Sequence, residues 1–167
     1  RTVGLSIDLF TEMGASVVAM PGGEIVPALE RGVIDAAEYN NPASDQALGF
    51  PDVAKICMVK SYHQPGECLE LLVGKRVHDA MPPAYQQILR YAAKSASTDM
   101  GWKLLDSYSR SWEEMRDKQG VKFVETPKDL LEAQLVAWDK VMAAKAAANP
   151  FFGKVLDSQR AFMKRVV

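Results

Sequence analysis

The fold of this chain is decided by the stretch Gly22-Gly23-Glu24-Ile25-Val26-Pro27-Ala28-Leu29-Glu30-Arg31-Gly32-Val33-Ile34-Asp35-Ala36-Ala37-Glu38-Tyr39. Its pattern predicts a helix over 24–31 that ends at Gly32, followed by a buried strand over 33–39. Ligands of open α/β sheets bind just beyond the carboxyl ends of the strands. The carboxylate and the aromatic ring that end this strand, Glu38 and Tyr39, are therefore a candidate site.

The segments before this stretch show the same alternation of strands and helices. We expect strands over 2–4 and 16–20, and between them a helix over 6–13 that ends at Gly14. The resulting βαβαβ order predicts a parallel sheet with right-handed crossovers.

The rest of the chain has a mainly helical pattern. We expect a short helix over 44–48, then extended segments over 53–59 and 67–73 on either side of a bend at 62–66. A long helix is predicted over 83–118, which Gly101 can interrupt. Thr126 and Pro127 form a helix start signal with the threonine as the cap. The Asn149-Pro150 pair separates that helix from a last one over 151–166.

Composition limits the classes of partner. The 167 residues are 48% hydrophobic and 25% charged, so they can bury a core. Basic and acidic residues are well mixed and give a formal charge of −1, which argues against nucleic acid or an anionic membrane as the main partner. Because Arg1 opens directly into a strand-like segment, without a methionine or a signal peptide, we expect the chain to belong to a longer protein.

Signals for catalysis are few. The two histidines, His63 and His78, lie in no recognisable catalytic signature, and His63 fits a structural hydrogen-bonding role better than that of a general base. The spacing of Cys57 and Cys68 fits no zinc or redox motif. Two buried thiols and a disulfide both remain open for them.

Two features can bind a ligand. Arg1, on the leading strand, offers a planar fork of donors that suits a carboxylate. Glu38, together with backbone carbonyls at the end of its strand, offers the oxygen ligands that sodium or calcium prefers. The alternative is an ordinary surface ion pair beside a packed tyrosine.

Several motifs resemble one family. The run from Gly22 to Glu38 is similar to the solute receptors of tripartite ATP-independent periplasmic (TRAP) transporters, of the DctP type. The runs Gly49-Phe50, Val53-Ala54-Lys55 and Tyr62-His63-Gln64-Pro65-Gly66 share that similarity, as does Asp45. The ending, with Asn149-Pro150-Phe151-Phe152, Ser158-Gln159-Arg160-Ala161-Phe162 and Lys164-Arg165-Val166, resembles the subgroup that binds 2-oxo or 2-hydroxy monocarboxylates. The resemblance covers about the carboxyl-terminal half of such a receptor.

The resemblance implies an α/β fold: a lobe like that of type II periplasmic binding proteins, with a parallel sheet and long carboxyl-terminal helices, truncated at the N-terminus. It also implies the site. Arg1 stands where the family has its carboxylate clamp, and Glu38-Tyr39 stands where the subgroup has a glutamate–tryptophan pair that binds a cation bridging to the substrate. Tyr39 would serve both substrate and cation, Gln64 would be a further cation ligand, and the cation would be sodium or calcium.

The resemblance further implies how the chain is organised and where it works. Residues 1–62 would form the ligand-binding lobe, and 63–105 a strand and helix that cross into the other lobe. Residues 106–148 would return to the first lobe, and 149–167 would be a terminal dimerisation helix. The same resemblance implies that the protein works in the periplasm and binds a small organic carboxylate. Its protein partners would be the membrane permease subunits of the transporter, and no nucleic acid would be a partner.

The last helix carries more apolar side chains than one narrow stripe holds. One seam comprises Phe151, Val155, Phe162 and Val166, and its neighbour comprises Phe152, Leu156 and Met163. We expect this helix to be exchanged between two copies of the chain, with Asn149-Pro150 as the hinge. The alternative is a helix folded back on its own lobe.

Two other functions compete with a binding protein. One is a small α/β enzyme, a lyase or hydrolase, with Glu38 as its base, and it requires a second acid or base within reach of Glu38, which the sequence does not reveal. The other is a pure interaction domain, which would leave Arg1 and Glu38 far apart.

Overall fold

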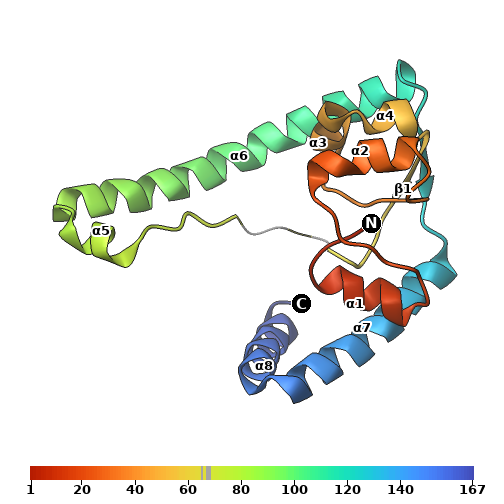
Figure 1. The fold of residues 1–167 in the computed structure, drawn as a ribbon. Coiled ribbons are helices and arrows are strands. Elements are labelled where there is room, and N and C mark those ends of the chain that lie inside the picture. The colour runs from red at the N-terminus through yellow and green to blue at the C-terminus, as the bar shows by residue number, and fades with distance from the viewer. Residues whose placement is uncertain (65, 67–68) are drawn as a thin grey trace. The chain divides into compact units, whose positions relative to one another are not determined.

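The computed structural model describes residues 1–64, 66 and 69–167. Figure 1 traces the chain through its helices and strands. In chain order these are α1 (Leu5–Glu12), α2 (Gly22–Glu30), α3 (Pro42–Leu48), α4 (Phe50–Val53), β1 (Ile56–Val59), α5 (Lys75–Ala80), α6 (Pro83–Asp117), β2 (Lys122–Glu125), α7 (Lys128–Ala148) and α8 (Pro150–Val166). No helix in the described ranges combines the length and the apolar character needed to cross a bilayer.

The chain divides into two compact units. The first contains α1, α2, α7 and α8 and comprises Arg1–Tyr39, Cys57–Pro65 and Phe123–Val167. The second contains α3 to α6 and comprises Asn40–Ile56 and Gly66–Lys122. The four segments predicted above divide the chain at other points, and they stay predictions.

The sheet that forms is a parallel pair of β1 and β2, not the sheet predicted over the first three extended segments. The Lys122 amide donates to the Lys55 carbonyl at 2.8 Å, and the Thr126 amide donates to the Val59 carbonyl at 3.0 Å. Both strands therefore run in the same direction. The strand expected over 53–59 begins only at Ile56, because Val53 is the last residue of α4. The segment expected over 67–73 lies partly outside the described residues, with no strand over 69–73.

The three strands expected over 2–4, 16–20 and 33–39 are not regular strands, although their pairing follows the predicted parallel order. The main-chain nitrogen of Arg1 donates to Ala36 at 2.8 Å, and the Arg1 carbonyl accepts from the Glu38 amide at 3.1 Å. The Thr2 amide donates to Val18 at 3.3 Å on the other side. The pairing stops at Thr2 because Gly4, at φ 63°, turns the chain into α1, which begins at Leu5.

The short helices α4 and α5 are not predicted from the sequence, and the longer helices agree with it except at two points. Gly101 does not interrupt α6, which is continuous over 35 residues. One glycine costs about 1 kcal/mol in a helix, and pairs four residues apart such as Lys103–Asp99 and Arg110–Asp106 support the helix around it. Thr126 does not cap α7, because its hydroxyl bonds to the Val59 and Lys60 carbonyls at the end of β1.

The core of the first unit lies between α1, α2 and α7. Leu9 and Ile25 are fully buried, and Ala137 and Val141 place the inner face of α7 against α1. Helix α8 folds back on α7, where Gly153 comes close to Ala146.

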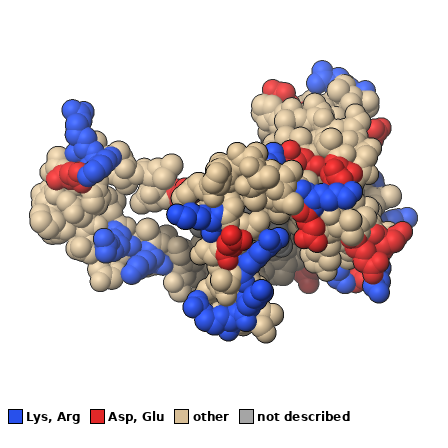
Figure 2. Space-filling model, turned by 90° about the horizontal axis from the view of Figure 1, so that it is seen from below, with Lys and Arg blue, Asp and Glu red and all other residues tan. Residues whose placement is uncertain are grey.

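Figure 2 shows lysine and arginine side by side with aspartate and glutamate on the face seen from below.

The motif glycine Gly22 has a packing role. A Cβ atom at Gly22 would lie 2.8 Å from Cε2 of the Tyr39 ring, whereas one at Gly23 would meet nothing within 4 Å. The ring of the candidate site therefore lies directly against the first turn of α2.

These two glycines give a matched pair of variants. We expect Gly22→Ala to lower the free energy of unfolding by about 1–2 kcal/mol relative to Gly23→Ala, because only the former must displace the Tyr39 ring. Both changes gain the same helix propensity, so it cancels in the comparison. Urea unfolding measures the difference, and equal stability of the two variants would contradict the packing argument.

Candidate functional site

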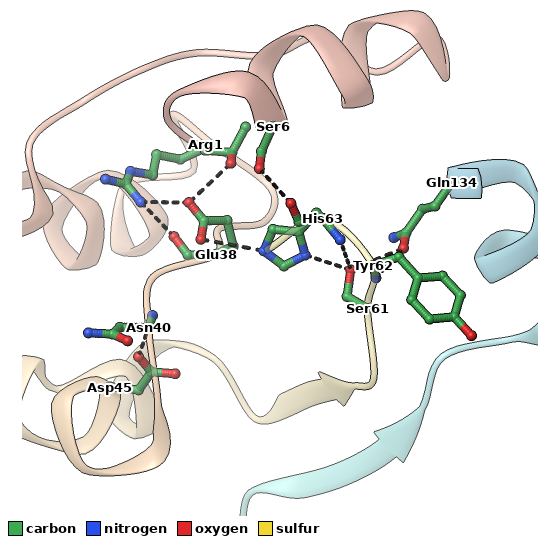
Figure 3. A network of polar contacts seen from close by, with 10 residues as sticks. Arg1, Ser6, Glu38, Asn40, Asp45, Ser61, Tyr62, His63 and Gln134 are labelled. Carbon is green, nitrogen blue, oxygen red and sulfur yellow. Dashed lines mark hydrogen bonds and ion pairs between the residues drawn. The ribbon is translucent and has the colours of Figure 1, made fainter. Parts of the chain in front are cut away.

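The candidate site lies where the leading segment meets the segment after α2. The backbone bonds of Arg1 to Ala36 and Glu38 place the Arg1 and Glu38 side chains next to each other (Figure 3). Their ion pair joins Arg1 Nη1 to Glu38 Oε1 at 3.0 Å, with 6% and 20% of the respective side chains exposed. It is therefore not an ordinary surface pair, and the interaction-domain alternative, which requires the two residues to lie far apart, is wrong.

Backbone carbonyls also accept hydrogen bonds from the Arg1 guanidinium. Nη1 also donates to the Glu38 carbonyl at 2.8 Å, and Nε donates to the Met20 carbonyl at 3.1 Å. Within the described part of the chain, Nη2 makes no hydrogen bond. The guanidinium is thus held rigidly on one side and keeps a donor group for a further partner.

Three side chains surround the Glu38 carboxylate. The Thr2 hydroxyl donates to Oε1 at 3.0 Å, beside Arg1, and His63 Nε2 lies 3.6 Å from Oε2. Burial alone would raise the pKa of Glu38, but the contacts from His63 and Thr2, with the charge of Arg1, outweigh it and lower the pKa from its ordinary value of 4.5. Glu38 is therefore held as a carboxylate.

The loop after β1 presents His63 to Glu38. It begins at Lys60, whose φ of 71° turns the chain out of the strand. Ser6 of α1 donates to the His63 carbonyl at 3.4 Å, and the Phe10 ring lies 5.6 Å from the imidazole, centroid to centroid. Ser61 Oγ is hydrogen-bonded to His63 Nδ1.

Helix α7 fixes the same loop from its other side. The Tyr62 amide donates to Gln134 Oε1 at 2.8 Å, and Ser61 Oγ donates to that oxygen at 3.2 Å. Trp138, one turn later, donates its indole N–H to the Tyr62 carbonyl at 2.7 Å. Both backbone groups of Tyr62 are thus bound by α7.

The structure brings together two of the four predicted site residues. Arg1 and Glu38 are in contact, while the Tyr39 ring lies against Gly22 and the Gln64 side chain is exposed just after His63. The ligand-binding roles of all four stay predictions.

Sequence analysis missed Thr2, Ser61 and Gln134. Thr2 lies two residues from the chain start in an expected strand, and nothing local marks it. Gln134 carried a usable signal, because it lies three residues after Leu131 and four before Trp138 and so shares a helix face with these two apolar residues. A polar residue at such a position needs a hydrogen-bond partner.

A cation at this site would rely on oxygen atoms, and not on a cluster of metal-binding side chains. No group of three or more histidine, cysteine, aspartate or glutamate side chains that could hold a metal occurs among the residues described. A hard cation at Glu38 would use its Oε2, since Oε1 already accepts from Arg1 and Thr2, and would draw further oxygens from backbone carbonyls and from a ligand. This donor set fits sodium or calcium.

His63 is also the second acid or base that the enzyme alternative requires, and Ser61, His63 and Glu38 form a hydroxyl–imidazole–carboxylate series. In a hydrolase the hydroxyl donates to the imidazole. Here the single Ser61 proton is directed to Gln134 Oε1, which can only accept, and Glu38 is bound by Arg1. The geometry therefore favours binding over nucleophilic catalysis.

Comparison with known proteins gives consistent matches. The sequence model of a family described as bacterial extracellular solute-binding protein, family 7 (DctP), matches residues 1–148. A monocarboxylate 2-oxoacid-binding periplasmic protein of Nostoc sp. is 29% identical over 170 residues, which cover 99% of this chain and 45% of that protein.

Solved structures of TRAP periplasmic solute-binding proteins have the same fold. One from Colwellia psychrerythraea, with bound calcium and pyruvate, has a TM-score of 0.91 and 28% identity, over 99% of this chain and 51% of its own. One from Pseudoalteromonas atlantica, with bound sodium and pyruvate, has a TM-score of 0.89 and 28% identity, over 99% and 50%. They confirm the predicted fold class, and this chain spans about half the length of these relatives.

The lowered pKa of Glu38 predicts how stability depends on pH. Because the pKa is lower in the folded state, the ionised carboxylate stabilises the fold above its unfolded value, and this contribution is lost as the pH falls through the folded value. Urea unfolding should show Glu38→Gln to be less stable than the native chain at pH 7, with the difference shrinking below pH 4.5.

The control is Glu125→Gln, which removes an exposed pair with Lys60 and should change stability little at either pH. A Glu38→Gln difference that stays constant from pH 7 down to acidic pH would show that the carboxylate charge does not stabilise the fold.

Proposed function

The chain belongs to family 7 of the bacterial extracellular solute-binding proteins, the DctP family, and from this premise we infer that it forms the carboxyl-terminal half of a TRAP transporter receptor. The receptor would work in the periplasm, bind a small organic carboxylate and deliver it to the membrane permease subunits. Its role would be binding without chemical conversion. The observation that carries the proposal is the nearly buried Arg1 guanidinium, held by Glu38 and Met20.

Arg1 would be the carboxylate clamp. Its Nε and Nη1 are already committed to the protein, which fixes the plane of the guanidinium. Nη2 remains for a ligand oxygen. A charge-assisted bond in this sheltered position is strong, and a lysine ammonium cannot replace a guanidinium that binds the protein through Nε and Nη1 and the ligand through Nη2.

Glu38 would hold a sodium or calcium ion beside the clamp, with the Tyr39 carbonyl and Gln64 as further ligands and Tyr39 also lining the substrate. The ion would also remove an electrostatic conflict, because a substrate carboxylate next to ionised Glu38 is repelled unless a cation lies between them. The relatives with bound pyruvate carry calcium or sodium. We therefore propose a 2-oxo or 2-hydroxy monocarboxylic acid as the substrate class.

The four segments 1–62, 63–105, 106–148 and 149–167 would be, in order, the ligand-binding lobe, the crossing into the other lobe, the return with its long helix, and a dimerisation helix. Helix α8 supports the last of these. Its seam of Phe151, Val155, Phe162 and Val166 remains exposed after α8 has packed on α7. A second copy of the chain would cover this seam.

Calorimetry tests the receptor function in a protein of the relatives' full length that contains this chain. Pyruvate should bind in the presence of calcium or sodium, and a chelated, sodium-free sample should bind it more weakly. Arg1→Lys should weaken binding at least about tenfold, or about 1.4 kcal/mol, whereas exposed Arg31→Lys should leave it unchanged. Equal affinity of Arg1→Lys and the native receptor would remove Arg1 from the site, and turnover of pyruvate would favour the enzyme alternative.

Light scattering tests the dimer. The native chain should have twice the molar mass expected for one copy, and a chain ending at Asn149 should have the mass of a single copy. Phe162→Asp, in the exposed seam, should act like the truncation because it places a charge in the interface. Particles that keep the same number of copies after both changes would rule out the dimerisation role of α8.

A further inference from the structure

Gln134 does not contact Arg1 or Glu38 in the described structure, but it is hydrogen-bonded to the loop that carries His63. We propose that this residue of α7 is a positioning residue for the Glu38 carboxylate, acting through Ser61 and His63. The proposal rests on the proposed function, in which Glu38 holds the cation.

The burial of Gln134 is the first argument. Only 2% of the residue is exposed, in the middle of a helix whose neighbouring buried positions are Ala137 and Val141. A buried amide is costly unless it is hydrogen-bonded. Its Oε1 accepts two bonds from the loop after β1, from the Tyr62 amide at 2.8 Å and from Ser61 Oγ at 3.2 Å.

The direction of these bonds is the second argument. An amide oxygen can only accept, so the single hydroxyl proton of Ser61 points to Gln134. Ser61 Oγ, held in this position, is also hydrogen-bonded to His63 Nδ1. Gln134 thereby fixes the place of the hydroxyl that holds the imidazole.

The orientation of the imidazole is the third argument. Ser6 binds the carbonyl of His63 and Phe10 lies near the ring, but neither makes a polar contact with a ring nitrogen. Within the described ranges, the polar contacts of the ring are Ser61 at Nδ1 and Glu38 at Nε2. Fixing Nδ1 therefore turns the Nε2 edge to Glu38 Oε2, the oxygen not used by Arg1 and Thr2.

The consequence concerns the oxygen that would bind the cation. Residues that orient a ligating carboxylate typically change metal affinity 10–100-fold when mutated. Because His63 is 3.6 Å from Oε2, we expect the lower end of that range.

Histidine ring nitrogen NMR tests the positioning without any ligand. The chain has two histidines, so His78 is an internal reference. Gln134→Met and Ser61→Ala should both shift the His63 nitrogen signals and leave those of His78 unchanged. Gln119→Met removes another partly buried glutamine, bonded to Gln46, and should leave both rings unchanged.

Calcium titration of the full-length receptor in the presence of pyruvate gives the second readout. Gln134→Met and Ser61→Ala should each weaken calcium binding about tenfold, and Gln119→Met should not. If Gln134→Met does not fold, Ser61→Ala carries the test, since Ser61 lies on the loop and not in the helix.

Two results would overturn the proposal: His63 signals in Ser61→Ala that match the native chain, or shifted signals with native calcium affinity. A native receptor that binds neither calcium nor pyruvate would instead overturn the proposed function. The histidine spectra would then still decide whether Gln134 orients His63.

Discussion

The ion pair between Arg1 and Glu38 is the constraint on which the rest of the site depends. A guanidinium that is 94% removed from water is costly unless its donors are bonded. Here one carboxylate oxygen and the carbonyls of Met20 and Glu38 accept the bonds from Nε and Nη1, and Nη2 makes none among the residues described. Because these acceptors come from two extended segments and Arg1 lies in a third, burial of the charge holds all three segments together. The pair thus links segments that form no regular strand.

The same pair sets the electrostatic field that the proposed ligand and cation would meet. Arg1 and Glu38 balance each other, so an anion alone would meet the field of Glu38 and a cation alone the field of Arg1. A carboxylate and a cation entering together keep the local charge at zero and give each ion an opposite partner. Coupled binding of both is therefore the electrostatically favoured use of this geometry. Pyruvate is bound together with calcium or sodium in the similar structures, which agrees with that argument.

Sequence reasoning located the longer helices and the pair of Arg1 and Glu38, but not the contacts around that pair. The start and stop residues of α2 and α8 are local signals, and Gly32 and Asn149 act as predicted. The segments 2–4, 16–20 and 33–39 form no regular strands, because a strand also needs a partner along its length, and that partner lies elsewhere in the sequence. Thr126 was assigned to the following helix, whereas its hydroxyl bonds to carbonyls 66 and 67 residues away. His63 was predicted as a structural hydrogen-bonder, and its contact with Glu38 depends on a loop conformation set by Lys60 and α7.

Gln134 and Trp138 show why the second layer of the site is hard to detect and still physically determined. They lie four residues apart on one helix face and bind the amide and the carbonyl of the same residue, Tyr62. A helix offers this spacing on every turn, so the pattern alone carries no information. Gln134 and Trp138 stand out because each lies on the face of α7 toward the loop and each carries a group that can form a hydrogen bond there. The buried Gln134 amide needs hydrogen-bond partners, and it finds them in Ser61 and Tyr62 of the loop after β1. These bonds hold the loop against α7 and so hold the His63 imidazole beside Glu38.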